Sequence, residues 1–343
     1  MKIAQIVSPI LRVPPEKYGG TELIASLLTE ELVRLGHDVT LFATADSKTS
    51  AKLRSIIKKP IGIGNPDMNP VWAHFAYAFE NAQEFDVIHN HGGMYGLIYA
   101  PLTKVPLITT LHNIYLEQGD PGFDYFKGNN FVSISRAQRK LIKGLNVVDM
   151  VHNSIDIGQF KFQPKKKGYL LWLSNCVANK GPDIAIKVAK ELGLKLIMSG
   201  KVDSRIPKNH RYFEKEVKPH VDGKNIIYMG EVAADKKAKL FEDAACLLFP
   251  IRWEEPFGMV MAEAMASGTP VVAYGRGAVP EVIKDQETGY VVKAGDYGAF
   301  VKRVRDVLDG KIDPQACRRH VEKHFIPQVM ARNYASVYKA LSA

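Results

Sequence analysis

Short apolar runs alternate with longer amphipathic stretches along almost the whole chain, and this alternation restricts the possible folds. In the first half, the candidate strands are residues 2–8, 38–44, 86–91, 107–112, 131–135 and 148–154. In the second half, they are residues 169–175, 194–200, 225–231, 245–250, 270–274 and 289–292. The intervening segments are long enough for crossover helices between parallel strands. We therefore predict an α/β protein with two doubly wound parallel sheets that bind ligands at the carboxyl ends of their strands.

The length of the chain and a polar segment between the two series of runs indicate two domains. A chain of 343 residues exceeds what one hydrophobic core usually supports. The segment 157–168 separates the two series, and we interpret its lysines 165–167 as part of a solvated linker. The expected domains are residues 1–156 and 157–325, followed by a last helix at 326–343.

The composition is that of an ordinary globular protein. Hydrophobic residues make up 46% and charged residues 24%, which argues against disordered, collagenous and coiled-coil classes. No apolar run reaches the roughly 18 residues that span a bilayer, and no signal-peptide pattern follows Met1, so we expect a cytoplasmic protein. The three cysteines are far apart and form no C-x-x-C pair, so neither a disulfide nor a structural zinc site is expected.

The net charge of +10 lies almost entirely in the second half of the chain. Residues 156–343 contain 31 Lys and Arg against 22 Asp and Glu, whereas residues 1–155 contain 15 against 14. A small acidic ligand such as a nucleotide diphosphate fits this distribution at least as well as a polymer, and we expect no nucleic-acid partner. The basic segment 50–60 is interpreted as a solvated loop, with at most a peripheral membrane contact.

The stretch EEPFGMVMAEAMASG, residues 254–268, places two acids around the start of a helix. The helix is expected to begin near Gly258 and to end at Gly268, after the strand 245–250. Glu255 then precedes the helix, and Glu263 lies about 8 Å along its axis at about 1.5 Å per residue. The backbone N–H groups that lack an intrahelical acceptor there belong to Phe257, Gly258, Met259 and Val260. These groups and the helix dipole favour an anion.

A diphosphate with a hydroxyl-rich group at each end suits this arrangement. Carboxylates accept hydrogen bonds from sugar hydroxyls, so each acid would hold one end of a nucleotide sugar. The alternative is an ordinary amphipathic helix with a solvated glutamate in its first turn, and the spacing by itself favours neither.

Other candidate residues follow the ends of predicted strands. Gly19, Gly20 and Thr21 lie between the first strand and the first long helix, where they form either a phosphate cradle or an ordinary turn. Lys180 is at the start of a helix and is placed to bind a diphosphate, or else is solvated.

Three histidines also lie at strand ends. His89 and His91 end the third strand and His112 ends the fourth. They are candidate hydrogen-bonding or acid/base groups, although a structural role is more common for each. No acidic residue completes a metal site with His89 and His91, so no metal is expected.

The segment 254–292 resembles the E-x7-E region of the retaining glycosyltransferases of family 4, which have the GT-B fold. Further similar segments are YGGTE, DVIHNH, TTLHN, FVSISRAQR, NSID, NKG, MGEV, FP and the last helix. The opening VPPEKYGGTE and the short length also resemble a subgroup of small antibiotic-pathway and archaeal or bacterial sugar transferases. The resemblance implies two Rossmann-like domains facing one cleft, with the donor in the C-terminal domain and the acceptor mostly in the N-terminal one. It implies no required metal or cofactor, and it implies that the last helix, residues 326–343, packs back on the N-terminal domain.

The resemblance also assigns roles to individual residues. Glu255 is expected to hold donor-sugar hydroxyls, Glu263 the ribose, and Lys180 the departing diphosphate. The backbone of residues 257–260 is expected to bind sugar hydroxyls and phosphate, and Gly20 to approach the diphosphate. His112 is expected to contact the transferred sugar, and the main chain at Glu231 and Val232 to contact the base. The catalytic set is therefore His112, Lys180 and Glu255.

The sequence departs from the family pattern at three positions. Asn175 replaces the usual Arg five residues before Lys180, so half of the cationic clamp is missing, and Arg252 and Arg276 are the candidate replacements. Ser154 and Ala278 stand where the family usually has glycine.

Together these observations predict a retaining transfer of a hexose such as glucose or mannose to a hydroxyl acceptor. A UDP-sugar is the favoured donor and a GDP-sugar the next. Two alternatives remain open: a GT-B-type nucleotide-sugar epimerase, which needs no acceptor, and a non-catalytic nucleotide-sugar or polyanion binder. The residues carry no signal for a particular oligomeric state.

Overall fold

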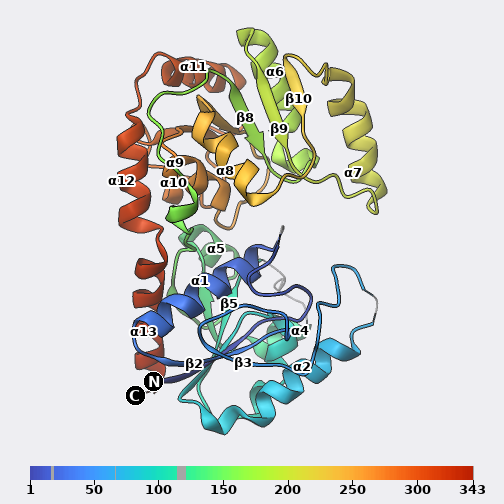
Figure 1. Ribbon diagram of the computed structural model, residues 1–343, viewed down its shortest axis with the longest axis vertical. Coiled ribbons are helices and arrows are strands. Elements are labelled where there is room, and N and C mark those ends of the chain that lie inside the picture. The colour runs from blue at the N-terminus through green and yellow to red at the C-terminus, as the bar shows by residue number, and fades with distance from the viewer. Residues whose placement is uncertain (17–18, 66, 114–120, 343) are drawn as a thin grey trace. The chain divides into compact units, whose positions relative to one another are not determined.

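The computed structural model describes residues 1–16, 19–65, 67–113 and 121–342. The chain divides into two compact units, Met1–Ser154 with Pro327–Ala343, and Ile155–Ile326. Each unit is built around one parallel sheet with a switch in strand order (Figure 1). The predicted α/β class with two doubly wound sheets is confirmed.

The first unit contains a seven-stranded sheet in the order β3-β2-β1-β4-β5-β6-β7. Its strands are β1 (Lys2–Ile6), β2 (Asp38–Phe42), β3 (Lys52–Arg54), β4 (Val87–Asn90), β5 (Leu107–Leu111), β6 (Asn130–Ser133) and β7 (Val147–Met150). The chain proceeds outward from β1 to β3 and then returns to β4 on the other side of β1. The strand order therefore reverses between β1 and β4, where α/β sheets usually bind ligands.

Within the described residues, six α-helices of the first unit surround this sheet. They are α1 (Gly20–Arg34), α2 (Asn69–Glu80), α3 (Met94–Leu97), α4 (Pro121–Phe126), α5 (Arg136–Leu141) and α13 (Pro327–Ser342). The buried side of α1 includes Ile24, Leu28 and Leu32. Leu35, the residue that follows the end of α1, is 41% exposed.

The segment 50–60 differs from the predicted loop, because it contains the edge strand β3. Lys52 pairs in register with Thr40 of β2, and its ammonium lies 2.8 Å from Asp38. A strand of three residues is too short to show the alternation of apolar and polar side chains by which strands are recognised in a sequence. Its pairing partners in β2 also lie 12 residues away in the sequence. Lys58 and Lys59 are exposed.

The last helix, α13, packs against α1 and β4. Its buried side chains include Met330, Tyr334, Val337 and Tyr338, which recur at helical spacing along one side. Tyr334 and Tyr338 are buried to 1% and 0% exposure, so their hydroxyl groups require hydrogen-bond partners inside the unit.

The second unit contains a six-stranded sheet in the order β10-β9-β8-β11-β12-β13. Its strands are β8 (Leu170–Leu173), β9 (Leu196–Ser199), β10 (Ile226–Tyr228), β11 (Cys246–Phe249), β12 (Val271–Tyr274) and β13 (Gly289–Val292). The order reverses between β8 and β11. Every strand predicted in this half is present, within three residues at each end.

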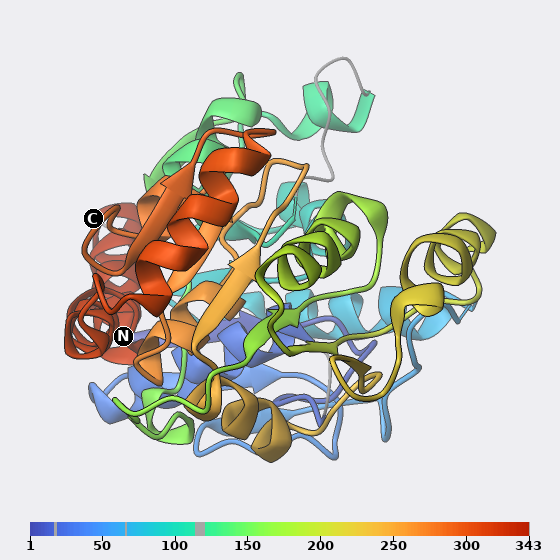
Figure 2. The ribbon, with the colours of Figure 1, turned by 90° about the horizontal axis from the view of Figure 1, so that it is seen from above.

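Helices cover both faces of the second sheet, as Figure 2 shows from above. They are α6 (Pro182–Leu192), α7 (Pro207–Tyr212), α8 (Ala234–Asp243), α9 (Met259–Ala266), α10 (Val279–Val282), α11 (Tyr297–Leu308) and α12 (Pro314–His324). The predicted helix near Gly258 is α9. Its apolar residues Met261, Ala262, Ala264 and Met265 are completely buried.

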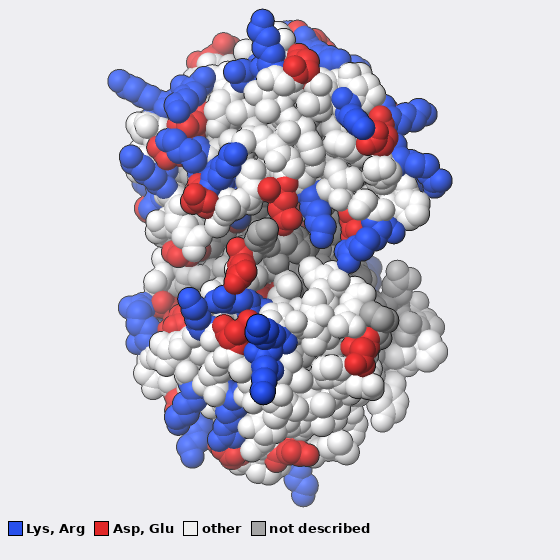
Figure 3. Space-filling model, turned by 45° about the vertical axis from the view of Figure 1, so that its right-hand side comes forward, with Lys and Arg blue, Asp and Glu red and all other residues white. Residues whose placement is uncertain are grey.

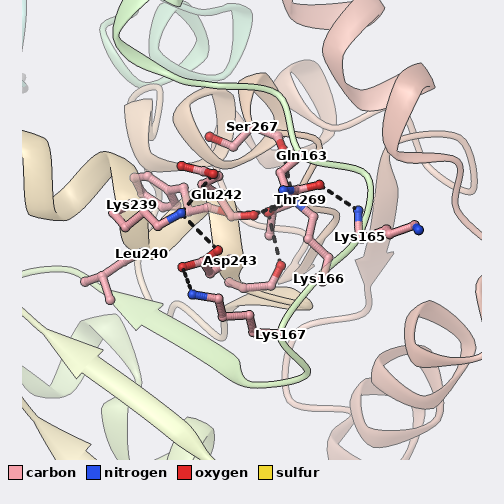
Figure 4. A network of polar contacts seen from close by, with 12 residues as sticks. Gln163, Lys165, Lys166, Lys167, Lys239, Leu240, Glu242, Asp243, Ser267 and Thr269 are labelled. Carbon is pink, nitrogen blue, oxygen red and sulfur yellow. Dashed lines mark hydrogen bonds and ion pairs between the residues drawn. The ribbon is translucent and has the colours of Figure 1, made fainter.

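The lysines 165–167 are not uniformly solvated, which corrects one expectation. Lys166 points inward and donates hydrogen bonds of 2.8 Å to the Ser267 carbonyl and Thr269 Oγ1, and one of 3.1 Å to the Glu242 carbonyl (Figure 4). Burial lowers the pKa of this lysine to about 8. Ser267 follows α9 and Glu242 lies at the end of α8, so one ammonium joins the carboxyl ends of both helices. Sequence spacing alone did not reveal these acceptors.

Candidate active site

A left-handed glycine starts α9 in the second unit. Gly258 has φ 82°, and a Cβ at this position would lie 2.5 Å from Met261 Cε and 3.2 Å from Glu255 Cγ. The glycine is therefore required by both its dihedral angle and the close approach of its neighbours. The N–H groups of Met259 and Val260 occupy the first turn, where an α-helix provides no intrahelical acceptor. This end of α9 favours a negative charge.

Glu255 forms a buried contact group with Lys180 and Trp253. Its Oε2 accepts a 2.6 Å hydrogen bond from Lys180 Nζ and a 2.9 Å hydrogen bond from Trp253 Nε1. The Lys180 ammonium also lies 4.3 Å from the centre of the Trp253 ring, a cation–π contact. Both polar contacts use the same carboxylate oxygen, so Oε1 keeps acceptor capacity for a ligand.

Glu263 lies inside α9 and is 5% exposed. Its Oε1 lies 2.7 Å from Lys237 Nζ, which α8 provides. Like Glu255, it is held by one lysine through one oxygen. The two predicted acids therefore lie before and within α9, and each is paired with one lysine.

Lys180 ends a short 3-10 helix, Ala178–Lys180, directly after β8. Gly181 follows it with φ 68°, and a Cβ there would lie 2.1 Å from the Pro250 carbonyl oxygen. The Lys180 carbonyl accepts a 3.1 Å hydrogen bond from the buried Trp172 indole. Backbone constraints thus fix the position of the lysine next to the end of β11.

Both candidate replacements for the missing arginine are already engaged. Arg252 donates 2.9 Å hydrogen bonds to the Ala178 carbonyl and to Asp183 Oδ1. Arg276 lies 3.0 Å from Glu254. Arg252 therefore braces the turn that carries Lys180, whereas Asn175 itself is exposed.

Two other departures from the family pattern are conformationally harmless. Ala278 has φ −78° and donates a 2.8 Å hydrogen bond to the Glu255 carbonyl, so it needs no glycine. Ser154 is completely buried, and its Oγ contacts Met330 Sδ at 3.4 Å. Gly277, with φ 57°, is the position that has no room for a side chain, because a Cβ would lie 2.2 Å from the Glu255 carbonyl oxygen.

The other predicted donor residues have different environments. Phe257 is buried with its ring 5.6 Å from that of Phe325, so its side chain belongs to the core. Glu231 is exposed and Val232 half-buried after β10, next to Gly230, whose carbonyl accepts a 2.8 Å hydrogen bond from Ser199. The structure brings Lys180 and Glu255 into contact.

The first unit contains a cavity of about 440 Å³ at the switch point of its sheet. Its lining residues are Ser8, Ile10, Thr21, Glu22, His91, Gly92, Gly93, Met94, Tyr95, Thr110, Leu111, His112 and Asn113. They come from α1, α3 and the carboxyl ends of β1, β4 and β5. Of the predicted residues, Thr21, His91 and His112 line this cavity. Gly19 precedes α1 and Gly20 begins it; the preceding Tyr18 of the YGGTE motif lies outside the described residues.

His112 is attached to a chain of buried hydrogen bonds. His112 Nε2 lies 2.9 Å from His91 Nδ1, and His91 Nε2 lies 2.6 Å from Gln5 Oε1. Because an amide oxygen only accepts, His91 carries its proton on Nε2, and its Nδ1 is the acceptor for His112. His112 therefore carries its proton on Nε2, and its Nδ1 is left as an acceptor.

The chain continues to the last helix. Gln5 Nε2 donates a 3.0 Å hydrogen bond to the Tyr338 hydroxyl, which lies 2.7 Å from His89 Nδ1. His89 Nε2 lies 2.7 Å from Thr110 Oγ1, and Thr110 lies 2.8 Å from the Tyr334 hydroxyl. The Tyr338 hydroxyl thus finds its partners in Gln5 and His89, and the Tyr334 hydroxyl finds its partner in Thr110.

Burial keeps these histidines neutral. It lowers the pKa of His112 to about 4 and places the pKa values of His89 and His91 well below the usual range. At neutral pH the three rings therefore act as uncharged hydrogen-bonding groups. Within the described part of the chain, no group of three or more His, Cys, Asp and Glu side chains is arranged to hold a metal ion.

Two family models match successive parts of the chain. The model described as Glycosyltransferase Family 4 matches residues 18–178, and the model described as Glycosyl transferases group 1 matches residues 155–324. The chain belongs to the GT-B glycosyltransferases.

Relatives of this glycosyltransferase cover different parts of it. The D-inositol 3-phosphate glycosyltransferase of Mycolicibacterium smegmatis is 22% identical over 92% of this chain and 84% of its own. An uncharacterized 41.2 kDa protein of the Klebsiella pneumoniae cps region is 27% identical, over 57% of this chain and 56% of its own length.

Solved structures share the fold of this glycosyltransferase. AviGT4, a glycosyltransferase involved in avilamycin A biosynthesis, is 22% identical with a TM-score of 0.75, and the match covers 99% of this chain and 98% of AviGT4. Anabaena HepE in complex with UDP-glucose is 17% identical with a TM-score of 0.75, over 99% of this chain and all of HepE. In the described residues, no helix has the length and apolar character that crossing a membrane requires.

Sequence reasoning about this glycosyltransferase missed four side chains that contact the predicted site residues or line the cavity. Trp253 lies two positions before Glu255 in a loop, and in a loop this spacing does not predict a contact between the two side chains. Lys237 is one of several lysines in α8, and only the fold shows that it is the one facing Glu263. Gln5 lies in the middle of an apolar strand. This position could have indicated a buried hydrogen-bond network, because a buried amide requires partners. Glu22 belongs to the YGGTE motif but was not assigned a role.

Proposed function

We propose that this glycosyltransferase transfers a hexose with retention from a nucleotide diphosphate sugar to a hydroxyl group. A UDP-sugar is the favoured donor and a GDP-sugar the next. The proposal rests on one observation above all: Glu255 and Lys180 are in contact beside the N-terminus of α9, which also carries the buried Glu263. UDP-glucose bound to HepE, a structural neighbour, supports the choice of base.

The chemistry requires stabilisation of the departing diphosphate. The N-terminus of α9 and the Lys180 ammonium are the positive groups next to Glu255, and they act without reorganising solvent. The Lys180 ammonium is paired with the Glu255 carboxylate. A diphosphate would compete for this ammonium, and the Trp253 ring keeps the ammonium nearby during the exchange.

The glutamates hold hydroxyl groups at the two ends of the donor. Glu255 has a free acceptor in Oε1 for the sugar, and Glu263 has one in Oε2 for the ribose. Glu255 then positions the sugar and is not a nucleophile. With retention, a diphosphate oxygen takes the proton of the attacking hydroxyl, so no protein base is needed, in accord with the low pKa of His112.

A thermal-shift screen with UDP-, GDP- and ADP-sugars tests the donor assignment. A ligand that binds the folded state at about 100 times its Kd stabilises it by about 2.7 kcal/mol, which a melting curve resolves. Glu263→Ala should remove the shift caused by the preferred donor, whereas Lys239→Ala, on α8 but paired with Glu242, should keep it. A full shift with Glu263→Ala would exclude this residue from the donor site.

Product analysis separates transfer from the two alternatives. A transferase releases nucleotide diphosphate in step with a glycosylated acceptor, and the anomeric configuration of the product reports retention. An epimerase changes the donor without any acceptor. A binding protein gives the thermal shift with neither product.

A non-catalytic polyanion binder is disfavoured by the distribution of charge. On the face shown in Figure 3, basic side chains occur in several separate groups with acidic side chains among them. Many of the lysines and arginines of the second unit are paired with acids, including Arg252, Lys237 and Lys239. On this face, the excess of +9 in the second half is therefore not gathered in one basic patch.

A further inference from the structure

The carboxyl end of α9 is bound by groups from remote segments of the second unit. The last four carbonyl groups of a helix have no intrahelical donor. In α9, the turn at Gly268 supplies backbone N–H groups to two of them, the carbonyls of Ala264 and Met265. The next two carbonyls, of Ala266 and Ser267, accept hydrogen bonds from two cationic side chains. The end of α9 is therefore held by tertiary contacts as well as by its own turn.

The two cations are Lys166 and Arg318. Lys166 Nζ lies 2.8 Å from the Ser267 carbonyl, and at 3.1 Å it also binds the Glu242 carbonyl at the end of α8 (Figure 4). Arg318 comes from α12, which packs against α9, and its Nη1 donates a 3.0 Å hydrogen bond to the Ala266 carbonyl. The Arg318 side chain is 18% exposed. The helix dipole favours a positive charge at this end, so charged donors fix α9 more firmly than neutral ones would.

The two helices that Lys166 joins also carry the residues of the proposed ribose site. Glu263 lies on α9, and its partner Lys237 lies 2.7 Å away on α8. α9 has eight residues, so its N-terminus is only about 12 Å from the end that the cations hold, at about 1.5 Å per residue. A hydrogen-bonded helix of this length moves as a rigid element. A shift at its carboxyl end therefore displaces both Glu263 and the helix N-terminus.

The charge of Lys166 changes at mildly alkaline pH. Burial lowers its pKa to about 8, so the ammonium loses its proton as the pH rises from 7 to 9. The charged and titratable groups around it are Lys165 and Lys167 on its own segment, Lys239, Glu242 and Asp243 on α8, and Cys317 and Arg318 on α12. Both of these acids are paired with lysines other than Lys166. Burial raises the pKa of the Cys317 thiol to about 12, so this thiol stays neutral in the same range.

We propose that Lys166 and Arg318 are positioning residues for the nucleotide-sugar donor. By holding the carboxyl end of α9, they set the positions of Glu263 and of the helix N-terminus, and neither of them touches the donor. The proposal rests on the proposed function, because it takes the donor as the ligand of α9. Loss of either cation then weakens donor binding in a protein that stays folded.

Nucleotide affinities of matched variants test the proposal. Lys166→Met and Arg318→Met should each weaken the binding of UDP, measured by calorimetric titration, by about fivefold or more, because a charged donor to α9 is lost. Lys165→Met and Arg319→Met change the exposed neighbouring residues and are the matched controls, which should bind UDP as the wild type does. Melting temperatures establish that each variant is folded at the temperature of the titration.

The pH profile separates positioning from a loss of overall stability. The affinity of the folded wild type for UDP should fall by about fivefold between pH 7 and pH 9, as Lys166 loses its charge. Lys166→Met should lack this decrease, and the difference between the two proteins cancels any titration of UDP itself. Arg318→Met should keep the decrease, because it leaves Lys166 in place. A wild type and a Lys166→Met variant with the same pH profile would overturn the role of Lys166.

Hydrogen exchange measured without added nucleotide tests the anchoring of α9 directly. The backbone amides of residues 259–268 should exchange about tenfold faster in Lys166→Met than in Lys165→Met. Equal exchange rates would overturn the proposal. So would UDP binding that is unaffected by either cation variant, and this result would leave the proposed function intact. A wild-type protein that binds neither UDP nor GDP would instead refute the proposed function, and with it the role of the two cations in donor binding.

Discussion

Lys180 Nζ and Glu255 Oε2 lie 2.6 Å apart, with only 15% and 10% of their side chains exposed. An ion pair with so little access to water is strongly destabilised when one partner is removed, because the other charge stays buried. The same two residues are the proposed diphosphate and sugar ligands. The pair therefore links the stability of the second unit to its function.

Lys180→Met should lower the free energy of unfolding by about 3 kcal/mol, since it leaves Glu255 uncompensated. Urea denaturation measures this change. Adding Glu255→Gln to the variant should restore most of the lost stability and none of the transfer activity. If the single variant is as stable as the wild type, the buried ion pair is not formed in solution.

Trp253→Phe should separate the two contacts of the indole. Phenylalanine retains a ring beside Lys180 and lacks the N–H that binds Glu255. Loss of this bond to a charged acceptor should reduce kcat/KM about tenfold. Trp72→Phe, at a 38% exposed position of α2, serves as the comparison and should have no effect. Equal kinetics for the two variants would count against a positioning role for Trp253.

Lys237→Ala should weaken binding of the nucleotide donor by about fivefold to tenfold, because Glu263 loses the ammonium that orients it. Calorimetric titration with UDP gives the affinity directly. Lys239→Ala is a suitable reference, since this lysine lies two residues further along α8 and pairs with Glu242 and Asp243. A loss of the same size in both variants would indicate a general electrostatic effect instead.

Stability should decrease as the pH falls from about 6.5 towards 4 because several histidines are buried in their neutral form. Burial lowers the pKa of His74 to about 4, against 6.5 for the free side chain. Between these values the unfolded chain binds more protons than the folded one, so acid favours unfolding, by about 1.4 kcal/mol per pH unit for one such group. In chemical denaturation at pH 6 and pH 5, His74→Gln should show a smaller pH dependence than the wild type. An unchanged dependence would mean that His74 titrates normally in the folded protein.

Lys166→Met should destabilise the second unit by about 2–3 kcal/mol, because it leaves two helix-end carbonyls and Thr269 without their charged donor. Lys165→Met, at the exposed neighbouring position, should change the unfolding free energy by less than about 0.5 kcal/mol. The melting temperatures of the two variants provide the comparison. Similar values for both would support the original interpretation of this segment as solvated.

The sequence predicted the sheets well because their strands are continuous apolar runs. Strands such as β5 and β12 are buried on both sides, so their composition alone distinguishes them from the helices between them. The same argument failed for β3, which is three residues long and lies at the edge of its sheet. It also failed for Lys166, because a lysine that binds helix ends has the same local sequence as a solvated one.

The positions of Glu255, Gly258 and Glu263 around a helix N-terminus follow from the sequence alone, because strand, turn and helix there are local structures. Which lysine faces each acid, and which histidine holds a proton on Nε2, is decided only by the tertiary structure. Lys180 is 75 residues from Glu255, and Gln5 is 86 residues from His91. Hydrogen bonds depend on distances of a few ångströms between side chains, and periodicity along the chain carries no information about such distances between remote segments.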